Sequence, residues 1–164
     1  MIVLTPQDAH AFNHIHPELG LPLPDGVEVV ELTALLAEAL DVGRLVLHPM
    51  DLSLTYHDPA LTPLFVSRAA LARRVLSALT TQPMREMFWR EGHAAPDGSV
   101  GGLEFTQPAL AARMTRERLV EAAATTAQML VTEDPAALAH LEAHAEGAGI
   151  KVAGLFELIT EHMA

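Results

Sequence analysis

The stretch Met129-Leu130-Val131-Thr132-Glu133-Asp134-Pro135-Ala136-Ala137 joins an apolar run to the start of a helix. Met129 to Thr132 has the length and composition of a buried strand. Asp134 is a residue type that often caps helices, and Pro135 suits the first helical turn. The stretch therefore predicts a strand that passes directly into a helix, which is the repeating unit of parallel α/β folds.

The same alternation of strand and helix signals continues along the rest of the chain. Further strand-like runs are Ile2–Thr5, Val27–Val30, Leu52–Tyr56, Met84–Trp89 and Ile150–Val152. Helical patterns cover Pro6–Leu19, Leu32–Leu40, a segment from a cap at Ser67 to about Leu79, Pro108 to about Gln128, and a last segment from about Leu155. This order predicts an α/β fold, a Rossmann-like three-layer sandwich with a mostly parallel sheet.

The length of the chain and the absence of a linker favour a single domain over residues 1–164. The segment Gly26–Leu36 resembles Gly149–Ile159, and each follows a strand and a helix. A second description, as two weakly repeated βαβα halves, therefore stays open. In a doubly wound sheet, sites form at the carboxyl ends of the strands, so residues at those ends are the first functional candidates.

Composition narrows the classes of function. The chain has a net charge of -11 and no basic cluster, which opposes binding to nucleic acids and to anionic membranes. It contains no Cys, so disulfides and thiolate-held metal clusters are excluded. The first residues lack a basic start followed by a long apolar run. We therefore expect a cytoplasmic protein that does not enter a membrane.

Three motifs lie where sites would form. Thr55–Pro59 reads Thr-Tyr-His-Asp-Pro, Pro96–Gly102 reads Pro-Asp-Gly-Ser-Val-Gly-Gly, and Val131–Ala137 reads Val-Thr-Glu-Asp-Pro-Ala-Ala. Their order, spacing and flanks resemble the cysteine-rich CCG domain found in heterodisulfide reductases and in the iron-sulfur proteins of glycolate and lactate oxidation systems. That family reads Tyr-His-Asp-Pro-Cys, Cys-Cys-Gly-x-Gly-Gly-Gly and Cys-Pro-x-Cys at these places.

The resemblance assigns a replaced residue to each cysteine of the family. An upstream stretch, Thr5-Pro6-Gln7-Asp8, also resembles the family's Ser-Pro-x-Cys. The former cluster-ligand positions are then Asp8, Ala60, Pro96, Asp97, Asp134 and Ala137. The candidates for a retained pocket are His57, Asp58, Gly98, Gly101 and Gly102, of which the last two suit a close approach of backbone to a cofactor. The resemblance implies an ancestry in cluster-dependent electron transfer, whereas the missing thiolates predict that no iron-sulfur cluster binds.

The polar residues of the motifs have two interpretations. Asp8, His57, Asp97 and Asp134 together offer oxygen and nitrogen ligands for a divalent metal ion. Each aspartate also has a structural explanation, as a helix cap, a first-turn residue or part of an Asp-Gly turn. His57-Asp58 is either a pair in which the carboxylate orients the ring or a turn. Two pairs of histidines, each four apart on a predicted helix, need a third ligand to bind zinc: His10 with His14, and His140 with His144.

The motifs favour a cluster-free, degenerate relative of the CCG domains. We expect a non-catalytic subunit, scaffold or regulatory module of a redox system, and not an enzyme by itself. The alternative is a metal- or small-molecule-binding protein, or an enzyme, that reuses the former cofactor pocket. Because members of the family often carry two such domains, the resemblance also implies a homodimer or a partner redox subunit. Phe88 and Trp89 are expected in the core or in such an interface.

Overall fold

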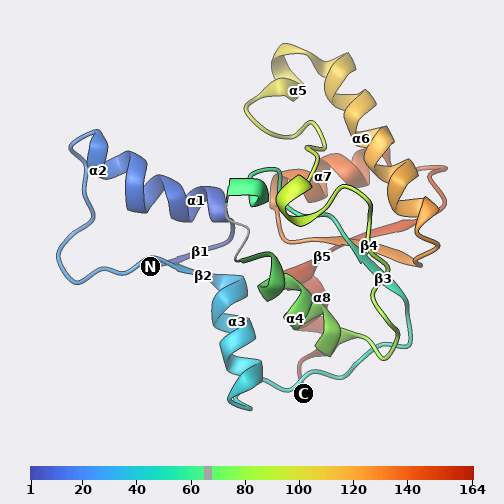
Figure 1. Ribbon diagram of the computed structural model, residues 1–164, viewed down its shortest axis with the longest axis horizontal. Coiled ribbons are helices and arrows are strands. Elements are labelled where there is room, and N and C mark those ends of the chain that lie inside the picture. Colours follow the sequence, from blue (N-terminus) through green and yellow to red (C-terminus); the bar gives the residue numbers. More distant parts are fainter. Residues whose placement is uncertain (65–67) are drawn as a thin grey trace.

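A computed structural model describes residues 1–64 and 68–164 (Figure 1). The fold is α/β, with parallel strands in two sheets that are flanked by helices. The smaller sheet pairs β1 (Ile2–Val3) with β2 (Val30–Glu31), and the larger sheet has the order β3-β4-β5. The strands of the larger sheet are Leu54–Tyr56, Met129–Thr132 and Lys151–Gly154. The predicted fold class is confirmed, and its strands are divided between the two sheets.

Helices surround both sheets. Residues 6–18 form one continuous helical segment, built from α1 (Pro6–His10), a π-helical turn (Ala11–Ile15) and α2 (His16–Glu18). The others are α3 (Leu32–Asp41), α4 (Ala69–Leu79), α5 (Leu103–Thr106), α6 (Pro108–Ala124), α7 (Pro135–His144) and α8 (Leu155–His162), with 3₁₀ turns at Thr62–Leu64 and Glu91–His93. Among the residues that the structure describes, no helix is long and apolar enough to cross a membrane.

Strand β4 is the centre of the larger sheet and separates two hydrophobic cores. Leu130 packs in a core with residues of α6 and α7, while the next residue, Val131, packs in a core with residues of α3, α4 and α8. Adjacent residues of a strand point to opposite faces, so a strand covered on both faces needs an unbroken apolar run. The helices in Figure 1 accordingly lie on both sides of β3, β4 and β5, which gives three layers.

The parallel register places the ends of the three strands at one edge of the larger sheet. Tyr56 pairs with Val131, and Thr132 pairs with Gly154. A hydrogen bond of 2.9 Å from His57 N to Val131 O extends the pairing of β3 with β4 beyond Tyr56. The loops that begin at this carboxyl edge therefore start close together, in the region where α/β proteins hold their ligands.

Some predicted elements differ from the structure. Met84–Trp89 was expected to be a strand but joins no ladder among the described strands; Arg85 N donates to Leu54 O at 2.8 Å, and Met87 is buried. The strand expected at Val27–Val30 is displaced to β2, and a short helix, α5, was not predicted. The cap expected at Ser67 lies outside the described residues.

A buried carboxylate joins the two sheets. Glu133, which follows β4, accepts hydrogen bonds from Tyr56 Oη at 2.8 Å, from Arg68 Nη1 at 2.6 Å and Nη2 at 3.2 Å, and from the Thr33 hydroxyl. Arg68 Nε also donates to Glu31 of β2 at 2.5 Å. Burial, together with the charge of Glu133, raises the pKa of the Tyr56 phenol, which therefore stays a donor. The network fixes β2 and α3 against the carboxyl edge of the larger sheet.

We predict that Glu133→Gln destabilises the protein by about 3–5 kcal/mol, because the substitution leaves Arg68 buried without its main counter-charge. Urea denaturation at pH 7 measures this loss. The matched control is Glu38→Gln, which removes an exposed ion pair to Arg44 and is expected to cost about 0–1 kcal/mol. Equal losses in the two variants would show that the Glu133 network does not hold the sheets together.

Candidate functional site

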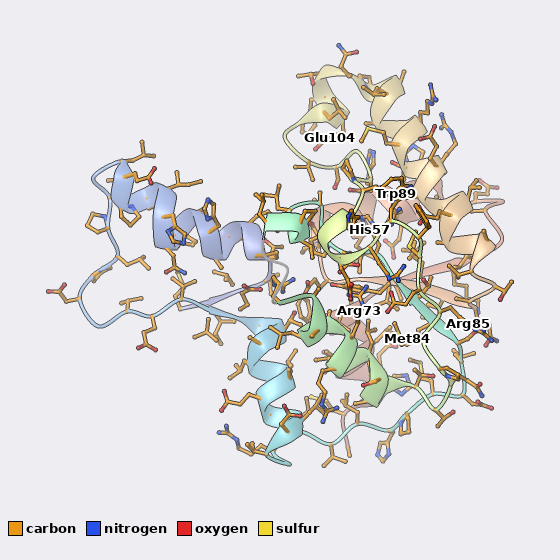
Figure 2. All side chains as sticks on the ribbon, viewed as in Figure 1. His57, Arg73, Met84, Arg85, Trp89 and Glu104 are labelled. Atoms are coloured by element: carbon orange, nitrogen blue, oxygen red, sulfur yellow. The ribbon has the colours of Figure 1, made fainter. Side chains whose placement is uncertain are left out.

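The candidate site lies at the carboxyl edge of the larger sheet. His57 follows β3, and Asp134 follows β4 and caps α7. The loop of residues 94–102 supplies Asp97, whose carboxylate lies beside the His57 ring. Both His57 and Asp97 are buried, with exposed fractions of 0% and 1%. In Figure 2, His57 is seen near the centre of the molecule.

The ring of His57 is enclosed between a cation and an anion. Arg118 Nη2 lies 3.4 Å from Nδ1 of the ring, and Asp97 Oδ1 lies 3.7 Å from Nε2. A guanidinium only donates, so Nδ1 is the acceptor and the neutral ring carries its proton on Nε2, which faces Asp97. Because both ring nitrogens face other side chains and the ring has no exposed surface, this histidine has no access to a substrate.

Asp97 is held by its own loop and by α6. Ser99 Oγ donates to Asp97 Oδ1 at 2.9 Å, and Thr115 Oγ1 of α6 donates to Asp97 O at 2.7 Å. Burial opposes ionisation of the carboxyl group, but the neighbouring His57 ring and the Ser99 hydroxyl outweigh this effect, so the pKa of Asp97 lies below its ordinary value. Asp97 therefore acts as an internal anion and as the start of an Asp-Gly turn.

The structure gives Asp58 partners other than His57, with which an orienting pair was one of the two interpretations. The Asp58 carboxylate accepts two hydrogen bonds from Arg73 of α4, at 3.0 and 2.9 Å, and a third from Glu91 N at 3.1 Å. Arg73 also forms an ion pair with Glu86, with 2.9 Å between Nε and Oε1. The carboxylate beside the His57 ring is that of Asp97. Thr55 and Tyr56 belong to β3, and residues 57–59 lead into a turn that is closed by a hydrogen bond of 2.8 Å from Thr62 N to Pro59 O.

Asp8 and Asp134 line a shallow pocket of about 340 Å³, together with Thr5, Gln7 and Ser99. Asp134 Oδ1 accepts from Ala136 N at 2.9 Å and from Ala137 N at 3.3 Å, which makes it the N-cap of α7. Thr5 Oγ1 donates to Asp8 Oδ2 at 2.8 Å at the start of α1. Burial raises the pKa of Asp134 above its ordinary value. The structural explanations of both aspartates are confirmed.

The former cluster-ligand positions are only partly brought together. Asp97, Asp134 and Ala137 lie around the carboxyl edge, and Asp8 reaches it through the shared pocket. Pro96 lines a different groove, beside α6, and Ala60 is half-buried in the turn after β3. In residues 1–64 and 68–164, no three His, Asp or Glu side chains are grouped closely enough to hold a metal ion. The four-residue metal site is therefore not formed.

The two histidine pairs also lack the further ligand that a zinc site needs. The ring centres of His10 and His14 lie 4.9 Å apart, and those of His140 and His144 lie 5.0 Å apart. His144 Nδ1 is 2.9 Å from His140 O, so this ring bonds to its own helix. Neither pair gains a third ligand from the described residues that would complete a zinc site.

The glycines of the loop serve the protein's own backbone. Gly98 has a φ of +97°, and a Cβ placed on it would lie 2.6 Å from Ala111 O and 2.8 Å from Ala111 Cα. Gly98 therefore allows the loop to approach the backbone of α6 closely. Gly101 and Gly102 adopt left-handed conformations, with φ of +70° and +71°, and turn the chain into α5. Their surroundings are open, with Phe105 at 3.8 Å from a Cβ on Gly102.

Arg118 is a site residue that the motifs did not reveal. Arg118 is buried on the same face of α6 as Ala111, Thr115, Leu119 and Ala122. This placement was visible in the sequence as an arginine on the apolar face of the helix. Burial lowers the pKa of Arg118, although Glu121 and other carboxylates oppose the effect.

Arg118 also fixes an exposed aromatic segment. Its Nη2 atom donates to Trp89 O at 3.1 Å, and Glu121 Oε1 accepts from Trp89 N at 2.8 Å. Phe88 and Trp89 are nevertheless 75% and 49% exposed, and their rings meet edge to face with centres 5.1 Å apart. We call this pair the aromatic ledge. Between the ledge, Pro96 and α6 lies a groove of about 480 Å³, and Trp89 is labelled next to α6 in Figure 2.

No model of a known protein family matches the chain, and no curated protein matches it. The resemblance to CCG domains therefore depends on the sequence motifs alone and stays a prediction. Function has to be inferred from the geometry of the carboxyl edge and of the groove beside the ledge.

We predict that Gly98→Ala costs about 2–4 kcal/mol of stability, because it combines a disfavoured φ with a clash against the backbone of α6. Gly101→Ala is the matched control, with a similar disfavoured φ but no atom within 4 Å of the new Cβ. This control is expected to cost about 1–2 kcal/mol. Thermal unfolding of both variants compares the two losses, and equal losses would mean that the contact with Ala111 is unimportant.

We predict opposite effects of Asp97→Asn and Asp134→Asn on acid stability. The lowered pKa of Asp97 contributes stability above its unfolded value of about 3.9, and this contribution disappears as the pH falls through the folded pKa. Asp97→Asn should therefore lose less stability than the wild type between about pH 6 and pH 3. The raised pKa of Asp134 has the reverse sign, since protonation there favours the folded state.

Asp134→Asn should accordingly lose more stability than the wild type over the same pH range. Asn keeps the capping oxygen, so the comparison isolates the charge. Urea denaturation at several pH values measures all three proteins. Parallel pH profiles for the two variants would contradict the assignment of opposite pKa shifts.

Proposed function

We propose that this protein is a non-catalytic, cluster-free relative of the CCG domains that works as a subunit or scaffold of a redox system. The observation that carries the proposal is the state of the carboxyl edge. His57 is enclosed by Arg118 and Asp97. The carboxylate of Asp58 binds Arg73, and the carboxylate of Asp134 caps α7. Groups that are held in this way inside the protein are poor candidates for acid-base or nucleophilic chemistry, which needs contact with a substrate.

The aromatic ledge supports a role in binding another protein. Trp and Phe are enriched at the centres of protein interfaces, where they bury large apolar areas. Here both rings are exposed, whereas the backbone beneath them is fixed by Arg118 and Glu121. A rigid, exposed anchor loses little conformational freedom on binding, which favours affinity. The groove beside the ledge is therefore the proposed docking site for a partner subunit.

The second candidate function is binding of a small polar molecule in the pocket that Asp8 and Asp134 line. The pocket is lined by two of the former cluster positions, and it offers the carboxylates of Asp8 and Asp134 and the unbonded carbonyl oxygen of Gln7 as acceptors. A ligand there would therefore be a donor, such as an amine. We rank this function second because Asp134 already caps α7, Asp8 is already bonded to Thr5 in the first turn of α1, and the pocket is shallow.

Two measurements test the preferred function. Anaerobic incubation with iron and sulfide is expected to leave the protein without a charge-transfer absorption band and without stoichiometric iron. A photoreactive phenylalanine analogue at position 88 is expected to crosslink, in the source cells, to a second copy or to a subunit with an intact cysteine-rich domain. The control is the same analogue at Val46, which is 60% exposed and far from the ledge in sequence.

Stoichiometric cluster binding, or equal crosslinking at both positions, would overturn the proposal. A different result would favour the second candidate: a rise in melting temperature with a small amine, lost in Asp8→Asn. This outcome would assign the function to the pocket and not to the aromatic ledge, so it distinguishes amine binding from the docking of a partner subunit.

A further inference from the structure

The outer face of α6 is an unpartnered apolar stripe. Its buried face carries Ala111, Thr115, Leu119 and Ala122. On the opposite side, Leu110 and Val120 are 47% and 69% exposed, and Met114 and Ala124 line the groove beside the ledge. In Figure 1, α6 lies at the periphery of the molecule, away from α3, α4 and α8. The outer side of the helix thus carries apolar side chains beside the charged residues Arg113 and Glu117, although only the inner side packs on the core.

The residues of this stripe are complementary to themselves in the antiparallel direction. An antiparallel pair of α6 helices centred on Glu117 places Leu110 opposite Ala124 of the second copy, and Met114 opposite Val120. Two apolar pairs therefore face each other on either side of the centre. A two-fold axis repeats each of these contacts, so one stripe serves both subunits.

The charges follow the same symmetry. The pairing places Arg113 of one copy opposite Glu121 of the other, and the axis repeats this contact. Glu117 meets its own copy at the axis, but Arg113 lies one turn away and already binds Glu117 within its own chain at 2.8 Å. Opposite charges thus accompany the apolar pairs, and the one contact between like charges has a cation beside it.

We propose that a second copy of this chain occupies the groove, with α6 packed antiparallel on α6 about a two-fold axis near Glu117. The inference rests on the proposed function, since it names the occupant of the same docking site. In this arrangement the half of α6 that carries Leu110 and Met114 lies beside the Phe88–Trp89 ledge of the other copy. The rings then cover the end of the partner helix, which accounts for an aromatic pair that is exposed in the single chain.

The absence of Cys from the chain permits a direct test with one introduced thiol. Packed helices lie about 8–10 Å apart, which leaves about 3.4–5.4 Å between Cα atoms that face each other at the axis. A disulfide spans the upper part of this range, from about 4.4 Å. Glu117→Cys is therefore expected to form a covalent dimer under mild oxidation at micromolar concentration. The substitution removes an exposed ion pair whose contribution to stability is small.

Ala124→Cys is the matched control on the same face. Its two copies would be separated by about 21 Å along the helix axis, so they should not crosslink. A second measurement uses Val120→Glu, which places a carboxylate in the apolar contact and should weaken the dimer at least about 10-fold, judged by light scattering. Val46→Glu, on an equally exposed residue outside α6, should leave the dimer mass unchanged.

A monomer mass for the wild type would overturn this inference and leave a heteromeric partner as the occupant under the proposed function. A dimer in which Ala124→Cys crosslinks as well as Glu117→Cys, or which survives Val120→Glu, would place the interface on another face and overturn it as well. If Val120→Glu fails to fold, as seen by circular dichroism, the two cysteine variants still decide the outcome. Cluster binding would contradict the proposed function without affecting the crosslink, so the two failures are distinguishable.

Discussion

The carboxylate of Glu133 is the point at which the separate parts of this fold are bonded to one another. It collects donors from α3, from β3 and from Arg68 at the start of α4, and Arg68 extends the connection to β2. A buried carboxylate with fewer donors would lower the stability of the fold, so the loss of any one of these hydrogen bonds is unfavourable. The relative position of the two sheets follows from this set of hydrogen bonds, because the smaller sheet has few strand residues of its own.

Three arginines turn inward around the same edge. Arg68 binds Glu133, Arg73 binds Asp58, and Arg118 lies between His57 and the carbonyl oxygen of Trp89. In many α/β proteins this edge is left open for a ligand. Here the protein's own cations and anions fill it, and removal of one member of a buried pair costs more than the pair contributes. These ion pairs are therefore difficult to lose one residue at a time during evolution, since each single substitution leaves a buried charge without its partner.

Local signals in the sequence were sufficient where a single segment decides the outcome. Strand β4, the Asp134 cap and the start of α8 at Leu155 follow from apolar runs and capping residues, and the structure has them as predicted. The segment from Met84 to Trp89 shows the limit. Met87 is buried, but Arg85, Glu86 and Phe88 are all exposed, and a strand also needs a neighbour to pair with. The partners of Glu133 and Arg118 could not be predicted, since they come from distant parts of the chain.

The strand order has a consequence for synthesis on the ribosome. Strand β3 pairs with β4, so Leu54 has to wait for Met129, and the Thr33–Glu133 hydrogen bond joins residues 100 positions apart. A nascent chain that ends within α6 therefore carries β3 and the apolar face of α4 with no sheet to receive them. Folding of the central layer is consequently a late event, completed after most of the chain has been translated. Exposure of these apolar segments in the meantime makes the unfinished chain a natural client for molecular chaperones.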